Sequence, residues 1–366
     1  MYRRTWPVKW ASKPVIVVGG GAVGFDLAPV YDLNVPIVTS WQAADLVDNW
    51  HPNYFGRPGI YGQRVANRVL YEADQIITLG CRLSKWMIGH GGLRTEQKVV
   101  MVEVDDAEVA KFKNAMQIKM PIDDFIGGLW TLADSTWINQ CASWRVPLIE
   151  DAHADTKGYI NSYRFMERLE PMLRPNEIVT CDVGSFMCSV YQVLRLKPDQ
   201  RLLSSGGLGE MGCGLPAAIG ASFARDGGEV LAMIGDGGMM INLQELATIE
   251  YHQLPIKVIV FANDGYAMIK GTYQNVKLPR VGVDRASGLG MPDIRRIAHG
   301  WGFAACDVRT WKDFDSAIPM LLDHKGPAIV VVHLDPEQAY VPRLQPIANA
   351  DGTFTPARFD QLSPIQ

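Results

Sequence analysis

Two polar side chains stand where two predicted buried strands end, and both are of types that bind a hard cation. Asp236 lies in a Gly-Asp-Gly turn directly after the apolar run 230–234, and Asn263 follows the apolar run 256–261. Runs of this length are typical of buried parallel strands, and the helical spacing of apolar residues between them indicates a βαβ unit. Carboxylate and amide oxygens are ligands that Mg²⁺ accepts. The segment therefore predicts a divalent-metal site.

Glycines surround this aspartate and leave room for a phosphate group. Gly235, Gly237 and Gly238 let the backbone come close to a ligand, and the helix expected to follow directs its free N–H groups toward the same point. Gly-Asp-Gly also occurs in turns that bind nothing. The two flanking strands and Asn263 favour the functional interpretation here.

The asparagine 27 positions after the aspartate (236 to 263) completes a pattern that resembles the thiamin diphosphate signature of the acetolactate synthase and pyruvate decarboxylase superfamily. The resemblance implies that Asp236, Asn263 and the backbone carbonyl of Gly265 hold Mg²⁺, while diphosphate oxygens and a water complete the octahedron. It also implies a set of cofactor-binding residues around the two strand ends. These are Gly209, Met211, Gly235, Asp236, Gly237, Gly238, Met239, Asn263, Gly265, Tyr266, Ala267 and Met268.

A second segment, residues 204–221, resembles the loop and helix that precede the metal motif in this family. The resemblance implies that the carbonyl of Gly209 accepts a hydrogen bond from the exocyclic amine of the cofactor. It also implies that Met211 wedges between the two cofactor rings. Filling of the core is the alternative for Met211, because methionine often serves that purpose. Glu210 departs from many relatives, which carry a small or hydroxyl residue there.

The residues after the metal motif occupy positions at which relatives face the thiazolium ring and the substrate. The resemblance therefore implies four catalytic residues, Met211, Gly209, Tyr266 and Met268. Packing of the next helix is the alternative for Tyr266 and Met268. Ile269 belongs to the same segment, and Lys270 could meet a substrate carboxylate or be one more exposed lysine. Residues 263–274 depart from acetolactate synthases, which leaves the product open.

The first half of the chain alternates strand and helix patterns, which predicts a mostly parallel α/β sheet. Strands are expected at 15–18, 36–39, 75–79 and 98–104, with a helix from Gly24 to about residue 32. Gly19-x-Gly21-x-x-Gly24 formally matches the dinucleotide fingerprint after a strand. The acidic residue that should end the next strand is missing, since that strand continues as Ser40-Trp41. The motif is therefore weak support for nicotinamide binding.

The same half offers a different interpretation of these glycines. Segments 39–41, 51–52, 56–62 and 79–83 resemble the central domain of the family. Some relatives bind FAD there in a structural role, whereas others keep the fold and bind nothing. We favour a domain without flavin. His51 and Arg57 could touch a ligand, but hydrogen bonds within the loop are the simpler expectation.

We expect two doubly wound α/β domains: a central Rossmann-like domain over residues 1–150 and a diphosphate-binding domain over 151–366 with an irregular tail. Residues 134–157 lack periodicity and are expected to be an exposed linker. His153 stands between Asp151 and Asp155, and exposed linker chemistry explains this group better than a metal cluster. In the second domain, helices are expected from residue 160 and at 292–299 and 311–322, and strands at 178–181 and 328–332.

Bulk properties narrow the functional classes. The 366 residues are 48% hydrophobic and 20% charged with a net charge of −4, so nothing indicates binding to nucleic acid or to an anionic membrane. No apolar run approaches the ~20 residues of a membrane span. The basic start lacks the apolar stretch of a secretion signal. Six cysteines without metal spacing predict reduced, mostly buried thiols in a cytoplasmic protein.

Typical family members have a third, pyrimidine-binding domain, whose glutamate hydrogen-bonds the cofactor ring. The resemblance therefore implies a split enzyme: this chain as the large subunit, the catalytic glutamate on a separate pyrimidine-binding subunit, and a hetero-oligomer with the cofactor at the interface. The expected reaction is decarboxylation of a 2-oxo acid such as pyruvate and transfer of the acyl unit to an acceptor. The alternatives are a decarboxylase that releases an aldehyde, an NAD(P)-dependent oxidoreductase, and a non-catalytic assembly subunit.

Overall fold

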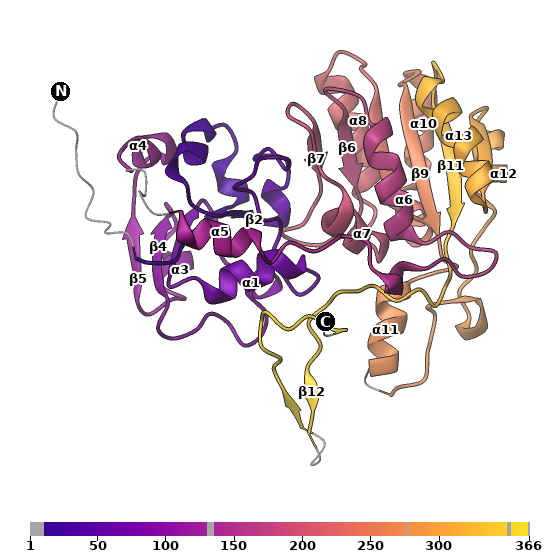
Figure 1. Ribbon diagram of the computed structural model, residues 1–366. Coiled ribbons are helices and arrows are strands. Elements are labelled where there is room, and N and C mark those ends of the chain that lie inside the picture. The colour runs from indigo at the N-terminus through magenta and orange to yellow at the C-terminus, as the bar shows by residue number, and fades with distance from the viewer. Residues whose placement is uncertain (1–10, 130–134, 276, 350–352, 365–366) are drawn as a thin grey trace. The chain divides into compact units, whose positions relative to one another are not determined.

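The computed structural model describes residues 11–129, 135–275, 277–349 and 353–364. Two compact units divide the chain between them, and each is considered by itself (Figure 1). The first unit comprises residues 1–148, 195–197 and 341–366, and the second comprises residues 149–194 and 198–340. The predicted α/β class is confirmed, because each unit has a parallel sheet with helices around it.

The C-terminal tail, residues 341–366, groups with the first unit, although the sequence placed residues 151–366 in the second domain. Asn67 Nδ2 donates to the carbonyl of Phe359 at 2.8 Å, and Arg64 Nη1 donates to the carbonyl of Leu362 at 2.7 Å. The Phe359 side chain is buried in the apolar core of the first unit. These contacts join residues almost 300 positions apart, so no local pattern could indicate them.

Five parallel strands form the sheet of the first unit, in the order β2-β1-β3-β4-β5. They are β1 (Pro14–Val18), β2 (Ile37–Thr39), β3 (Gln75–Leu79), β4 (Lys98–Val102) and β5 (Ala115–Ile118). Ile16 of β1 is in register with Ile37 of β2 and with Ile77 of β3. The four strands predicted in this half are confirmed, and β5 is an addition. The tail contributes an antiparallel pair, β12 (Ile347–Ala348) and β13 (Phe354–Thr355).

Short helices cover both faces of this sheet. The α-helices are α1 (Arg64–Glu72), α2 (Lys85–Ile88), α3 (Asp106–Val109), α4 (Ile122–Gly127) and α5 (Thr136–Ala142), and the 3₁₀ helices are η1 (Gly20–Ala22), η2 (Ala28–Leu33) and η3 (Trp41–Ala43). Successive strand residues point to opposite faces. Val15 and Val17 therefore share a core with α1 and α5, whereas Ile16 and Val18 share one with η2 and α4.

The helix expected from Gly24 to about residue 32 is different in the structure. Gly24 has a φ of 88°, and the helical segment is the 3₁₀ helix η2, which begins only at Ala28. Pro29 lacks an N–H group, so it suits the first turn of a helix and not the interior of a longer one. The N–H of Ala28 donates instead to Asp26 Oδ1 at 2.9 Å.

Residues 135–157 are mostly exposed, as expected of a linker, but they include the helix α5 and the buried His153. Within the first unit they contain α5, where the indole nitrogen of Trp137 donates to the carbonyl of Pro14 at 2.8 Å. Within the second unit His153 is fully buried and stacks on Tyr163, with 4.0 Å between the ring centroids. No cluster of three metal-binding side chains occurs in the described part of the chain. The His153 ring therefore belongs to the packed interior of the second unit.

Two of the fingerprint glycines, Gly19 and Gly21, follow β1 and lie against the turn after β3. The N–H groups of Gly19 and Gly21 donate to the carbonyls of Leu79 and Gly80 at 2.9 and 3.0 Å. A Cβ atom at Gly19 would lie 2.2 Å from the Gly80 oxygen. Close approach of two backbones accounts for these glycines, and their N–H groups already have acceptors in the chain.

Six parallel strands form the sheet of the second unit, in the order β10-β11-β9-β8-β6-β7. They are β6 (Ile178–Cys181), β7 (Arg201–Leu203), β8 (Val230–Gly235), β9 (Ile256–Ala262), β10 (Ala304–Val308) and β11 (Ala328–His333). The strands predicted at 178–181, 230–234, 256–261 and 328–332 are confirmed. Strands β7 and β10, which lie at the two edges of the sheet, were not predicted.

The helices of the second unit cover both faces of its sheet (Figure 1). They are α6 (Ser162–Leu169), α7 (Phe186–Val193), α8 (Gly214–Ala224), α9 (Asp236–Ile241), α10 (Leu246–Tyr251), α11 (Ala267–Asn275), α12 (Ile294–Gly300) and α13 (Trp311–Asp323), with short 3₁₀ helices at Asp151–His153, Glu170–Met172, Leu243–Glu245 and Arg285–Ser287. The helices predicted from residue 160 and at 292–299 and 311–322 are confirmed as α6, α12 and α13.

Residues that alternate along β9 explain which helices lie on which face. Val258 and Val260 share a core with α8, α10 and α12. Phe261 points the other way and contacts Phe165 of α6 and Phe186 of α7, with ring centroids 5.3 and 4.8 Å apart. Phe165 also contacts Phe314 of α13 at 5.2 Å. The sheet is thus covered on both sides by apolar side chains.

The strand order of the second sheet creates a place for a ligand. From β6 the chain moves outward to the edge strand β7 and then returns across β6 to β8. In open parallel sheets, ligands bind at the carboxyl ends of strands where the order reverses in this way. The turns after β6, β8 and β9 therefore surround the expected binding position, and they carry Asp182, Asp236 and Asn263.

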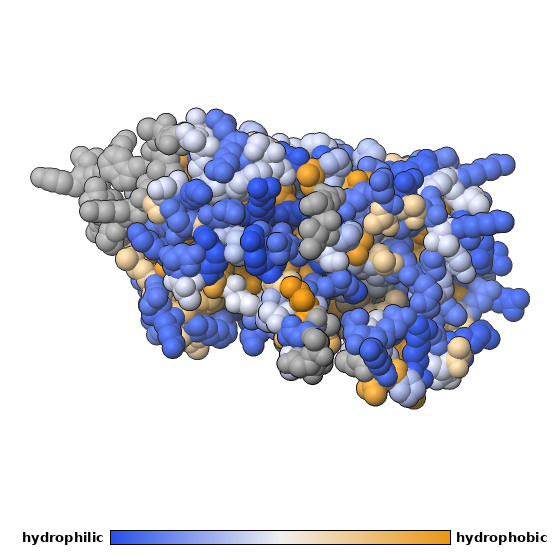
Figure 2. All heavy atoms as spheres, turned by 60° about the horizontal axis from the view of Figure 1, so that its bottom comes forward, coloured by the Kyte–Doolittle hydropathy of each residue, from blue (hydrophilic) through white to orange (hydrophobic). Residues whose placement is uncertain are grey.

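None of the described helices is long and apolar enough to cross a bilayer. Figure 2 shows a face that is mostly hydrophilic, with hydrophobic residues in scattered places. Such scattered apolar atoms are normal on protein surfaces.

Candidate functional site

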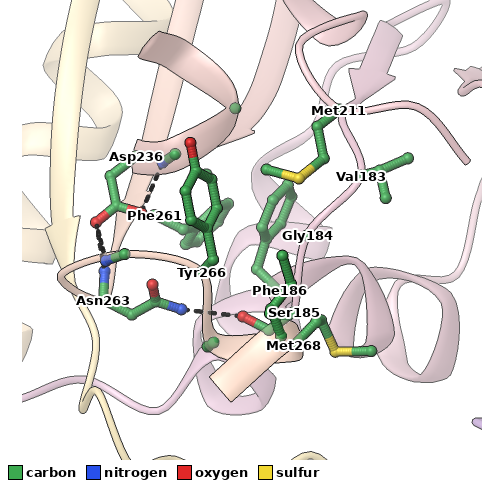
Figure 3. Close-up of a pocket in the computed structure, with 16 residues that line it drawn as sticks. Val183, Gly184, Ser185, Phe186, Met211, Asp236, Phe261, Asn263, Tyr266 and Met268 are labelled. Atoms are coloured by element: carbon green, nitrogen blue, oxygen red, sulfur yellow. Dashed lines mark hydrogen bonds between the residues drawn. The ribbon is translucent and has the colours of Figure 1, made fainter. Parts of the chain in front are cut away.

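Asp236 lies at the point where β8 ends and α9 begins, and its carboxylate organises two turns. Its Oδ1 accepts from the N–H of Gly237 at 2.8 Å, and its Oδ2 accepts from the N–H groups of Asn263 and Gly265 at 3.1 and 3.2 Å (Figure 3). Only 4% of the residue is exposed. The carboxylate therefore fixes the turn after β9 onto the end of β8.

Burial determines the charge state of this carboxylate. It raises the pKa of Asp236 to about 6, although the surrounding backbone N–H groups act in the opposite direction. The group is still ionised at neutral pH, but its charge is held in a poorly solvated place. A bound divalent cation would offset the cost of that charge.

Asn263 provides the second oxygen. Its amide nitrogen Nδ2 donates to Ser185 Oγ at 3.0 Å, and the residue is 8% exposed. Its amide oxygen Oδ1 is buried and accepts no hydrogen bond from any described residue. A buried amide oxygen normally has a partner, because an unpaired one costs free energy. The residues present thus fit a cation bound between Asp236 and Asn263.

Gly265 lies two residues after Asn263, and its backbone has a conformation that only glycine adopts readily. Its φ is 137°, and a Cβ atom there would lie 2.1 Å from the carbonyl oxygen of Val283. The N–H of Tyr266 donates to that same oxygen at 2.9 Å. The glycine therefore lets the chain turn tightly after Asn263, next to the Asp236 carboxylate.

A pocket opens at these strand ends (Figure 3). Ten of the predicted cofactor-binding residues line it: Met211, Gly235, Asp236, Gly237, Gly238, Asn263, Gly265, Tyr266, Ala267 and Met268. The Tyr266 ring lies on the glycine turn, since a Cβ atom at Gly237 would be 2.4 Å from Tyr266 Cε1. The structure thus brings together residues from segments that are separated in the sequence.

Two of the predicted cofactor-binding residues do not line this pocket. Met239 is 1% exposed and its side chain packs in the apolar core beneath α8 and α10. Gly209 lies in the exposed loop before Met211, with a φ of 76°. Any contact of these two residues with a cofactor therefore stays a prediction about their backbone atoms.

Lys270 and Glu210 also lie outside the lining of the pocket. The Lys270 ammonium group donates to the carbonyl of Pro336 at 2.9 Å and pairs with Glu337, and 8% of its side chain is exposed. It joins α11 to the segment after β11 and does not line the pocket. Glu210 is exposed, and its carbonyl accepts from Ser205 Oγ at 3.1 Å.

The structure adds residues that sequence reasoning did not assign to the site. Val183, Gly184, Ser185 and Phe186, from the turn after β6, line the pocket together with Phe261 of β9. In the sequence, the Asp-Val-Gly-Ser turn directly follows the predicted strand 178–181. Its proximity to Asn263 follows from the strand order, which the sequence does not display.

Asp182 connects this turn to the loop that carries Met211. Its Oδ2 accepts from the N–H of Gly212 at 3.0 Å, and its Oδ1 lies 3.4 Å from Cys213 Sγ. A Cβ atom at Gly238 would lie 2.0 Å from Asp182 Oδ2. Burial raises the pKa of this carboxyl above its ordinary value. Asp182 thus holds the Met211 loop next to the glycine turn.

Comparisons with known proteins agree with this geometry. Residues 8–129 match the family described as thiamine pyrophosphate enzyme, central domain, and residues 182–332 match thiamine pyrophosphate enzyme, C-terminal TPP binding domain. The chain belongs to the thiamine pyrophosphate enzymes. The second match begins at Asp182 and includes both strand ends that carry Asp236 and Asn263.

Curated relatives are acetolactate synthase large subunits. The chain is 31% identical over 353 residues to acetolactate synthase isozyme 1 large subunit of Escherichia coli K12, covering 92% of this chain and 61% of that protein. It is 27% identical over 356 residues to the probable acetolactate synthase large subunit of Methanococcus aeolicus (90% and 59%), and 26% identical over 373 residues to that of Methanocaldococcus jannaschii (96% and 62%). The chain thus spans about three-fifths of their length.

Proposed function

We propose that the pocket at the ends of β8 and β9 binds Mg²⁺ and thiamin diphosphate. Asp236, Asn263 and the backbone carbonyl of Gly265 would hold the cation, and the turn 235–238 would receive the diphosphate. The observation that carries this proposal is the buried, unpaired Oδ1 of Asn263 beside the buried Asp236 carboxylate. Oxygen donors of this kind suit a hard divalent cation.

Thiamin diphosphate, when bound, would supply a nucleophilic carbon and an acceptor for the electron pair released when a 2-oxo acid loses CO₂. The residues of this chain bind and orient. Asp236 and Asn263 anchor the cation, and Met211, held by the Asp182–Gly212 hydrogen bond, supports the cofactor rings. Phe186 and Phe261 give the pocket an apolar wall that limits the access of water.

The reaction that we propose is acetolactate synthase-like. A 2-oxo acid such as pyruvate is decarboxylated, and its acyl unit is transferred to an acceptor. Support comes from the names of the relatives, acetolactate synthase large subunits. Release of an aldehyde in place of transfer is the second candidate, because the anchoring residues would serve both reactions equally.

A separate polypeptide completes the site in this proposal. The two matched domains are the central and C-terminal ones. The glutamate that promotes proton transfer on the cofactor ring would come from a pyrimidine-binding subunit, so that the active enzyme is a hetero-oligomer. We place it in the cytoplasm, a compartment that keeps thiols such as those of its six cysteines reduced.

Thermal unfolding in the presence of ligands tests the cofactor assignment. Mg²⁺ with thiamin diphosphate should raise the unfolding temperature, and at 100 times the dissociation constant the gain in unfolding free energy is about 2.7 kcal/mol. NAD⁺ or NADP⁺ should produce no shift, because the N–H groups of Gly19 and Gly21 already have acceptors. Stabilisation by the dinucleotide alone would overturn the proposal.

A further inference from the structure

Ser185 contacts Asn263 although 78 positions separate them in the sequence. The serine follows the turn after β6 and precedes α7, and it is 5% exposed. Its Oγ lies 3.0 Å from Asn263 Nδ2 (Figure 3). Within the described residues, the amide oxygen of Asn263 has no hydrogen-bond partner.

The serine hydroxyl is not used to cap the helix that it precedes. Ser185 occupies the N-cap position of α7, where serine usually accepts from a backbone N–H of the first turn. Here its side chain makes no such capping bond within the described structure. The hydroxyl therefore remains directed toward the pocket and toward Asn263.

An asparagine amide has two ends of similar shape and opposite character. Its oxygen attracts a cation, whereas its N–H₂ group repels one. A half-turn about the last side-chain bond would exchange the two ends, and a hydrogen-bond partner decides between them. Ser185 Oγ, by accepting from Nδ2, favours the orientation in which Oδ1 faces the cation position.

The hydroxyl of Ser185 carries a proton of its own. A serine can donate as well as accept, so its proton needs a position away from Asn263. The Tyr340 hydroxyl is buried near Ser185 and Asn263, but it has no hydrogen-bond partner among the described residues.

We propose that Ser185 is a positioning residue that holds the Asn263 amide with its oxygen toward the bound divalent cation, a role that rests on the proposed function. Partners in the outer shell of a metal site commonly orient the ligands in this way, and their loss weakens metal binding by about 10- to 100-fold.

The test compares serine variants in the full chain with its partner subunit, when one co-purifies. Titration with Mn²⁺ in the presence of thiamin diphosphate, followed by electron paramagnetic resonance, reports the cation affinity without any measurement of activity. Ser185→Ala should bind the cation about tenfold more weakly or worse. Ser185→Thr, which keeps the hydroxyl, should recover most of the affinity.

Ser189→Ala is the matched control. Ser189 is also a buried serine of α7, but its Oγ donates to the carbonyl of Phe186 at 2.6 Å. This variant should leave the Mn²⁺ affinity within about twofold of the wild type. An equal loss in Ser185→Ala and Ser189→Ala would overturn the inference, because it would show a general effect on the helix.

The failure of this inference differs from failure of the proposed function. A wild-type chain that binds no Mn²⁺ with thiamin diphosphate overturns both. A wild type and a Ser185→Ala variant that bind it equally well overturn the role of Ser185 alone. If Ser185→Ala does not fold, Ser185→Cys serves in its place, because a thiol is a weaker hydrogen-bond acceptor than a hydroxyl: weaker Mn²⁺ binding supports the arrangement, and unchanged binding overturns it.

Discussion

Asp236 Oδ2 lies 3.1 Å from the backbone nitrogen of Asn263, although 27 positions separate the two residues. The same oxygen accepts from the N–H of Gly265 at 3.2 Å. One carboxylate thus shapes the turn that supplies the other two proposed cation ligands. The proposed cation binding and the local fold therefore depend on the same carboxylate.

Replacement of Asp236 should abolish the response to the cofactor. In Asp236→Ala, Mg²⁺ with thiamin diphosphate should no longer raise the unfolding temperature, because both the charged ligand and the acceptor for the Asn263 turn are lost. Differential scanning fluorimetry with and without ligand measures this. Asp293→Asn, at the exposed start of α12, should respond like the wild type. A full response in Asp236→Ala would contradict the site.

Asp182 should make stability depend on pH. Burial raises the pKa of its carboxyl above 3.8, so the native state holds this proton more tightly than the unfolded state does. Its contribution to stability is fully present below about pH 3.8 and is lost as pH rises through the raised pKa. Urea unfolding at several pH values should show that the free energy of unfolding falls less steeply with rising pH in Asp182→Asn, because its amide side chain stays neutral. An identical slope in both proteins would count against it.

Gly265 should tolerate substitution less well than a glycine that has open space around its Cβ position. Both Gly265 and Gly282 have positive φ, at 137° and 64°, but a Cβ atom meets Val283 oxygen at 2.1 Å only in the first case. Gly265→Ala should therefore lower the free energy of unfolding by about 1–3 kcal/mol more than Gly282→Ala. Chemical denaturation measures both, and equal losses would argue against the crowded turn.

Gly19 should be needed for packing in the first unit. Its Cβ atom would lie 2.2 Å from the Gly80 oxygen and 2.4 Å from Cys81 Cα, which are backbone atoms that cannot move easily. Gly19→Ala should cost about 1–3 kcal/mol or more of unfolding free energy. Gly127→Ala, with open space around its Cβ position, should change it little. Similar stability of the two variants would refute the packing explanation.

Lys270 should affect stability and not substrate binding. Its ammonium group is largely buried and binds the Pro336 carbonyl and Glu337, outside the pocket. Lys270→Met should lower the unfolding free energy by about 1–3 kcal/mol, since charged hydrogen bonds are lost. The KM for the 2-oxo acid, measured with the partner subunit, should stay unchanged, as it should in the exposed Lys277→Met. A raised KM in Lys270→Met alone would restore a role at the substrate.

The sequence by itself determined the features that depend on short stretches of the chain. Apolar runs located the interior strands β6, β8, β9 and β11, because a strand buried on both faces needs nearly continuous apolar residues. The glycines and the polar residues Asp236 and Asn263 at the strand ends indicated the chemistry. Strands β5, β7 and β10 were not predicted, because half-exposed edge strands lack such apolar runs.

Only the tertiary structure decided which distant residues meet. The order of strands places Ser185, after β6, within hydrogen-bond distance of Asn263, after β9. It also joins Asp182 to Gly212 and returns the tail to the first unit through Phe359. Such contacts depend on how whole elements pack and on which buried polar groups need partners. That information is spread over the chain and has no local signature.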